Sequence, residues 1–181
     1  VYLDIEKKIY ESGGIPLVIN NLYFNEYLDI CDGFILQGGD DIDKNNLNII
    51  KILFDKDIPL LGICLGMQEM GICYDGIEFE VENHLNINHD IIINKSSLLY
   101  DIVKADEIRV NSRHRWCIKE TNLYVSAKDK NNLIIEAIEG KNKLFFLGLQ
   151  WHPENLDDIY SKRIFTYFVK TCIIYKANKK S

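Results

Sequence analysis

The chain of 181 residues is poor in proline, with only 3, and we find no internal repeat or low-complexity linker in it. Apolar residues make up 47% of the sequence and charged residues 27%. Disordered chains lack the apolar side chains needed for a core, and collagen-like chains need periodic glycine with abundant proline, so both classes are excluded. The length is that of one domain of ordinary size. We therefore expect a single globular domain with a large core.

Long apolar runs and an excess of positive charge are also missing. The longest apolar runs, such as 91–93 and 144–147, are far shorter than the roughly 20 residues that cross a bilayer. Asp4 and Glu6 are unlike the basic start of a secretory signal. The net charge of -6 repels phosphate backbones and anionic lipids. These features predict a cytoplasmic protein that binds neither nucleic acid nor membranes.

No cysteine pair stands at the spacing of a metal or disulfide motif. The five cysteines, at positions 31, 64, 73, 117 and 172, form no CxxC pair and no even framework. His84 and His89 have no cysteine or carboxylate at ligand spacing, so we interpret them as loop histidines. Three aspartates near the start of an expected helix lack the Gly and distant Glu of a calcium loop and favour N-capping: Asp40, Asp41 and Asp43. We predict no metal site and no cofactor.

In the first half, helical and strand patterns alternate. Helices are expected over 2–12, 25–31 and 43–55, the last capped by Asp43 or Asn45, and apolar strands over 15–19, 33–37 and 59–63. Such alternation is typical of βαβ units and of a parallel sheet that is covered on both faces. The expected fold class is therefore α/β.

In the second half, short turns join most of the apolar segments. Strands are expected over 91–93, 108–111, 123–127, 133–138 and 144–150, with a hairpin tip at 139–142. A helix over 98–103, capped by Ser96 or Ser97, interrupts them, and an amphipathic helix over about 157–175 closes the chain. We expect one domain over residues 1–176, followed by a polar tail at 177–181.

The strongest local motif is G-I-C-L-G at residues 62–66, at the end of an apolar strand. A strand that turns sharply into a helix leaves no room for side chains at Gly62 and Gly66, and it exposes Cys64 at the carboxyl end of the strand. A cysteine at a helix N-terminus is stabilised as thiolate, which is the form that attacks a carbonyl carbon. The alternative is a cysteine buried in the core of the sheet. The glycines on both sides of Cys64 favour a nucleophile.

A thiolate nucleophile needs a proton carrier, and the segment G-L-Q-W-H-P-E at 148–154 supplies the best candidate. His152 follows a predicted strand and would leave the same sheet edge as Cys64. Glu154 would hold the far nitrogen of the imidazole and fix its tautomer. Taken alone, this motif also fits an exposed loop histidine beside a capping glutamate. Together with the motif around Cys64, it predicts a Cys-His-Glu arrangement.

Four motifs, and their order along the chain, resemble class I glutamine amidotransferase domains, most closely the gamma-glutamyl-gamma-aminobutyrate hydrolase branch. They are Q-G-G-D at 37–40, the Cys64 turn, V-N-S-R-H at 110–114 and Q-W-H-P-E at 150–154. The resemblance extends over essentially the whole chain. It implies a flavodoxin-like three-layer sandwich with a mostly parallel central sheet. It also places a strand and a loop before the helix at 2–12, so we expect that the N-terminal strand is missing from this sequence.

The resemblance implies that Cys64, His152 and Glu154 cleave a γ-glutamyl amide through a γ-glutamyl thioester. Backbone amides of Leu65 and Gly39 would form the oxyanion hole. Four further residues match the substrate-binding positions of the family: Gln68, Asn111, Ser112 and His114. For the last three, the alternative is that Asn111 and Ser112 merely end a strand and that His114 is exposed.

Three functions remain open. The first is an independent hydrolase of a small γ-glutamyl substrate that needs no cofactor, which the Gly-Gly-Asp loop and the Asn-Ser-x-His segment favour. The second is a glutaminase subunit that delivers ammonia to a separate synthetase. The third is a catalytically silent binding or regulatory module. The sequence leaves open whether the chain forms a homo-oligomer and which amine the substrate carries.

Overall fold

The computed structural model describes residues 2–81, 84–131 and 133–179. A seven-stranded sheet runs through its centre in the order β1-β2-β9-β8-β7-β4-β5. The strands are β1 (Phe34–Leu36), β2 (Leu60–Ile63), β4 (Leu85–Ile93), β5 (Glu107–Arg113), β7 (Tyr124–Asp129), β8 (Ile135–Glu139) and β9 (Phe146–Leu149). β1, β2 and β9 pair in parallel, and the pairings beyond β9 are antiparallel.

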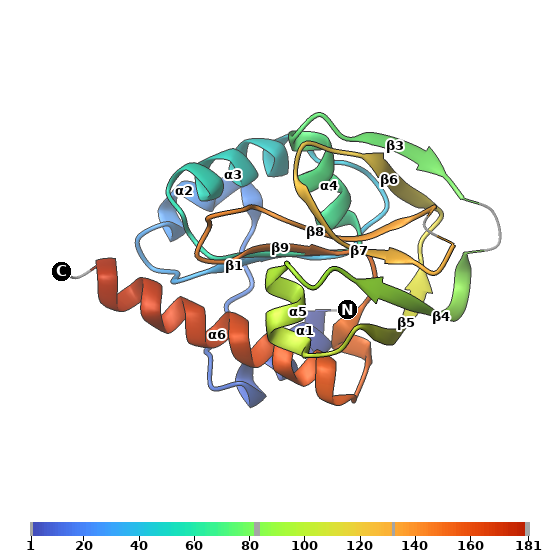
Figure 1. Cartoon of the computed structure of the whole chain (residues 1–181). Coiled ribbons are helices and arrows are strands. Elements are labelled where there is room, and N and C mark those ends of the chain that lie inside the picture. The colour runs from blue at the N-terminus through green and yellow to red at the C-terminus, as the bar shows by residue number, and fades with distance from the viewer. Residues whose placement is uncertain (1, 82–83, 132, 180–181) are drawn as a thin grey trace.

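Helices cover both faces of this sheet, so the molecule has three layers (Figure 1). On one face lie α2 (Phe24–Tyr27), α3 (Lys44–Asp55) and α4 (Leu65–Cys73), and on the other lie α1 (Tyr2–Glu11), α5 (Leu98–Val103) and α6 (Ile159–Lys179). Two single turns, η1 (Asn21–Tyr23) and η2 (Pro153–Asn155), precede α2 and α6. The expected α/β fold is confirmed.

Several local predictions are confirmed at the level of single caps and turns. Asp43 caps α3, where its side chain accepts a hydrogen bond from the amide of Asn45, and Ser97 caps α5 in the same way. The predicted hairpin tip joins β8 to β9, which are antiparallel, and the amide of Gly140 donates to the carbonyl of Phe146. These caps and turns depend on neighbouring residues only, which is why the sequence could predict them.

The prediction of a strand over 15–19 is wrong. This segment has no regular structure, and Ile15 is 95% exposed. A strand needs a neighbour for its backbone hydrogen bonds, and within the described residues β1 at this edge pairs only with β2. An apolar pattern without a partner strand therefore stays irregular.

The structure differs from two other expectations and contains one strand pair that was not expected. The helix expected over 25–31 is shorter, because α2 ends at Tyr27 and the chain continues as a turn with Ile30 exposed. The last helix continues to Lys179, beyond the predicted end, and Lys176 and Lys179 bind the segment around Asp32 and Leu28.

A separate antiparallel pair, β3 (Ile77–Glu80) and β6 (Trp116–Glu120), was not predicted. Its strands have only four and five residues, which is too short for their pattern to predict a strand reliably.

None of the helices within the described ranges combines the length and the apolar character that crossing a bilayer requires.

Candidate active site

Cys64 occupies the sharp turn between β2 and α4, as the G-I-C-L-G motif predicts. β2 is buried along its whole length, and α4 starts at the residue after the cysteine. The backbone of Cys64 has φ 53° and ψ -106°, a conformation that residues other than glycine rarely adopt. Its amide donates to the carbonyl of Leu149 at 2.8 Å, which fixes the turn against β9. Strain of this kind at a nucleophile is typical of a functional turn.

The two glycines of the motif have a steric cause. A Cβ at Gly66 would overlap the carbonyl of Leu36 in β1, and a Cβ at Gly62 would overlap Met70 and the backbone of Gly66. Because these two positions carry no side chain, α4 can pack directly against the sheet at the turn.

We expect Gly66→Ala to lower the free energy of unfolding by at least about 2 kcal/mol, because the overlap with a strand backbone cannot be relieved by a side-chain rotation. Gly39→Ala is the control, since the only atom within 4 Å of its Cβ would be a terminal methyl carbon of Leu65, which a side-chain rotation can move. Urea denaturation of both variants measures the difference. Equal stabilities of the two variants would contradict the steric explanation.

His152 and Glu154 follow β9, the parallel neighbour of β2. Both side chains are buried, and His152 Nδ1 lies 2.7 Å from Glu154 Oε1. Burial by itself lowers the pKa of His152, but hydrogen bonds with Cys64 and Glu154 outweigh it and raise the pKa to about 9. The structure thus brings the three predicted residues together, with the imidazole between the thiol and the carboxylate.

The glycine loop at 37–40 lies against this group. A Cβ at Gly38 would come 3.0 Å from His152 Cε1 and 3.5 Å from Cys64 Cβ, so the loop backbone approaches both side chains closely. A Cβ at Gly39 would lie 2.8 Å from a methyl carbon of Leu65. The two segments predicted to form an oxyanion hole are therefore neighbours.

The side chain of Asn111 holds the backbone of His152. Its Nδ2 donates to the carbonyl of His152 at 3.0 Å, and its Oδ1 accepts from the amide of His152 at 2.8 Å. Ser112 and His114 are also buried and bonded within the protein: Ser112 Oγ donates to the carbonyl of His84, and His114 Nδ1 lies 3.1 Å from the carbonyl of Trp116. The alternative of an exposed His114 is excluded, because the side chain is only 4% exposed.

Gln68, one turn along α4, belongs to a small network of amides. Its Nε2 donates to the carbonyl of Trp116 at 2.5 Å and to Gln150 Oε1 at 3.3 Å. Gln150 Nε2 in turn lies 3.9 Å from Cys64 Sγ. Gln150 was not predicted as a site residue. Its position two residues before His152 could have indicated a place in the site, because alternate residues of an extended segment lie on the same face.

The interpretation as loop histidines is wrong for His89, whereas His84 does lie outside the strands, directly before β4, but is buried. His89 lies within β4, and both rings face the carboxylate of Glu136 on β8, with distances to Oε1 of 3.4 Å from His84 Nε2 and 2.9 Å from His89 Nε2. Sequence spacing could not show this partner, because it is 52 and 47 residues away.

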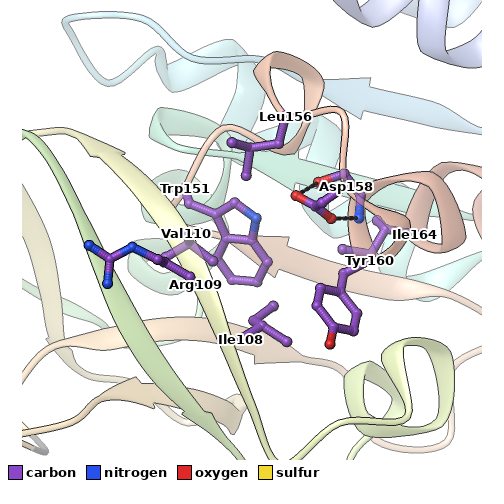
Figure 2. Close-up of a pocket in the computed structure, with 9 residues that line it drawn as sticks. Ile108, Arg109, Val110, Trp151, Leu156, Asp158, Tyr160 and Ile164 are labelled. Carbon is purple, nitrogen blue, oxygen red and sulfur yellow. Dashed lines mark hydrogen bonds between the residues drawn. The ribbon is translucent and has the colours of Figure 1, made fainter.

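Trp151 points to the other side of β9 and fills a small hollow there, as Figure 2 shows. The lining includes Ile108 and Val110 of β5 and Tyr160 and Ile164 of α6, and its free space does not hold a water molecule. Asp158 at this hollow accepts a 2.7 Å hydrogen bond from the amide of Ser161 and so caps α6. The hollow is part of the packing that anchors the segment carrying His152, and none of the predicted site residues lines it.

Comparison with known proteins gives the family. The Peptidase C26 family model matches residues 43–154. A glutamine-hydrolyzing GMP synthase chain of Haloarcula marismortui is 30% identical, and the match covers 94% of this chain and 89% of that protein. The gamma-glutamyl-gamma-aminobutyrate hydrolase of Escherichia coli K12 is 25% identical, with 95% and 86% covered.

Among solved structures, the glutaminase domain of Trypanosoma brucei CTP synthase, with bound acivicin, matches with a TM-score of 0.83. It is 18% identical, and the match covers 96% of this chain and 88% of that one. That likeness supports the fold, and the family match and the relatives indicate an enzyme of the cysteine hydrolase or glutamine amidotransferase type. The chain belongs to the Peptidase C26 family, and thus to the class I glutamine amidotransferase-like proteins.

Proposed function

We propose that the protein hydrolyses a γ-glutamyl amide, with Cys64 as nucleophile, His152 as proton carrier and Glu154 as the group that orients the imidazole. The observation that carries the proposal is the placement of His152 between the two other side chains, hydrogen-bonded to both. The strained backbone of Cys64 at the start of α4 supports the assignment of the nucleophile.

The reaction would begin with attack of the Cys64 thiolate on the amide carbon, which places negative charge on the carbonyl oxygen. Backbone amides of Leu65 and Gly39 would stabilise this oxyanion, and one such donor is typically worth ~3 kcal/mol. His152 then gives its proton to the leaving amine, and the carbon-nitrogen bond breaks to leave a γ-glutamyl thioester. In the second half, His152 takes a proton from water and the resulting hydroxide attacks the thioester carbon. The carbon-sulfur bond then breaks, which releases glutamate and restores the Cys64 thiolate beside the protonated His152.

For the substrate-binding positions we propose two kinds of role. Gln68 belongs to the network that reaches Cys64 through Gln150, so it would act on the substrate side of the site. Asn111 would position His152 through its two backbone hydrogen bonds. Ser112 and His114 would support the structure around the site without contacting the substrate, because their polar atoms are hydrogen-bonded or buried inside the protein.

A second candidate is a glutaminase chain that delivers ammonia to a separate synthetase. The relative that favours it is the glutamine-hydrolyzing GMP synthase chain, at 30% identity. In this function the thioester chemistry at Cys64 is the same, but the ammonia passes to a partner. A catalytically silent binding or regulatory module is the third candidate, and the intact Cys-His-Glu group argues against it.

A panel of γ-glutamyl amides, including glutamine and γ-glutamyl-γ-aminobutyrate, separates these functions. The purified protein should release glutamate from at least one member without any partner, and Asp157→Asn, a substitution of an exposed carboxylate outside the Cys-His-Glu group, should leave the rate unchanged. Turnover that needs an added synthetase would favour the glutaminase chain. The absence of turnover in both conditions would reject both enzymatic proposals.

A further inference from the structure

A second group of buried polar side chains lies beside the candidate active site and has no direct part in the proposed hydrolysis. It contains His84, which precedes β4, His89 in β4, His114 between β5 and β6, and Glu136 on β8. The ring centroid of His84 lies 4.5 Å from that of His89 and 4.9 Å from that of His114. His84 is 8% exposed, His114 is 4% exposed and Glu136 is fully buried. Three imidazoles around one buried carboxylate need an explanation.

The hydrogen bonds inside this cluster are incomplete. The carbonyl of Trp116 can only accept, so His114 Nδ1 carries the hydrogen and Nε2 carries the lone pair. Cys117 Sγ, 3.2 Å from the same Nδ1, is a weak second acceptor. His114 Nε2 is buried without a partner, and so are Glu136 Oε2 and His89 Nδ1. These are three of the five such side-chain atoms among the described residues. Buried polar atoms without partners are rare in folded proteins, and a bound ion or water is one of the causes that account for them.

Two of these unpartnered atoms, His114 Nε2 and Glu136 Oε2, are of the chemical types that bind a metal. One ligand atom each from His84, His114 and Glu136 lie within 4.8 Å of one another. Two imidazoles and one carboxylate form a ligand set that zinc prefers, with a fourth position left for water or a further side chain. The hydrogen bond from His114 Nδ1 to a backbone carbonyl is the arrangement that fixes the other ring nitrogen toward a metal.

We propose that His84, His114 and Glu136 bind one divalent transition-metal ion of the zinc type. His89, whose Nε2 lies 2.9 Å from Glu136 Oε1, would hold the carboxylate in place. The ion would connect the start of β4, the β5–β6 connection and β8, which are far apart in sequence. By holding His114, the ion would also fix the carbonyl of Trp116, which accepts hydrogen bonds from His114 and Gln68. It would thereby fix the position of Gln68 in the neighbouring site.

The test uses the Cys64→Ala chain, because a Cys-His-Glu group could itself bind zinc. After removal of metal with a chelator, this protein should bind one equivalent of either Co²⁺ or Zn²⁺, and the two ions should compete. The Co²⁺ form should show the absorption bands of a site with nitrogen and oxygen ligands and no thiolate-to-cobalt charge-transfer band. Glu136→Gln and His84→Ala in the same background should weaken binding at least about 100-fold, since loss of outer partners alone costs 10–100-fold. His152→Ala in that background is the control and should bind metal as before.

A second measurement does not depend on the folding of ligand variants. In the Co²⁺ form of the Cys64→Ala chain, proton NMR should show two hyperfine-shifted imidazole N–H signals that disappear in D₂O. Failure to bind metal, a thiolate charge-transfer band from Cys117, or equal affinity in folded Glu136→Gln would each overturn the proposal. Because the Cys64→Ala chain carries no nucleophile, the result is independent of whether the proposed hydrolysis is correct.

Discussion

Replacement of Cys64 by alanine is expected to lower the rate of γ-glutamyl hydrolysis by roughly 10⁶-fold, the effect found when the nucleophile of a serine-protease triad is removed. The physical reason is that the thioester cannot form, and the remaining backbone donors only bind the substrate. Initial rates of glutamate release from the best substrate of the panel measure the effect.

Cys73→Ala is the matched control, because Cys73 is the other cysteine of the same region and stands at the far end of α4, where its thiol donates to the carbonyl of Leu47. It should keep the rate within a factor of about three, as expected for a residue without contact to the reacting atoms. Activity of Cys64→Ala near that of the wild type would contradict the assignment of the nucleophile.

The second large effect is expected for Glu154→Gln, which keeps the shape of the side chain and removes its charge. The rate should fall by roughly 10²- to 10⁴-fold. The glutamine amide carries no charge, so it stabilises the imidazolium less than the carboxylate does, and it also favours the correct tautomer less. Hydrogen bonds with Cys64 and Glu154 raise the pKa of His152 to about 9 against the effect of burial. Loss of the Glu154 charge should therefore lower that pKa.

Two pH measurements check this effect. His152 must be protonated to release the amine, so kcat/KM of the wild type should fall as pH rises through about 9, and in Glu154→Gln this fall should occur at lower pH.

The raised pKa of His152 also contributes to the stability of the fold. Its contribution is complete below the ordinary pKa of 6.5 and is lost as pH rises to about 9. The free energy of unfolding of the wild type should thus decrease over this window more than that of Glu154→Gln. Identical pH profiles would show that Glu154 does not act on His152.

Local signals accounted for most of what the sequence predicted correctly. The turn at Cys64 follows from two glycines whose absent side chains leave room for a strand backbone and a helix, and this depends on spacing alone. The convergence of Cys64 with His152 followed from the rule that parallel strands end at one edge, and β2 and β9 are indeed parallel neighbours.

The sequence could not predict features that depend on distant partners. The segment at 15–19 has the pattern of a strand, but strand formation depends on a neighbour that the pattern does not contain. Glu136 meets His84 and His89 only because β8 and β4 both pair with β7. Asn111 was singled out for the substrate, whereas its side chain binds the backbone of His152, a contact across 41 residues.

The most direct test of the central claim is the labelling of the protein by a glutamine-like electrophile, followed by peptide mass spectrometry. The account predicts that Cys64 alone among the five cysteines is modified at low reagent concentration, because its thiol is hydrogen-bonded to an imidazole that the buried carboxylate of Glu154 holds. Cys117 also lies beside an imidazole, that of His114, but it is fully buried, and burial raises the pKa of its thiol. His152→Ala should slow the labelling strongly. Modification of another cysteine instead, or an unchanged rate in His152→Ala, would contradict the claim that these two side chains work together.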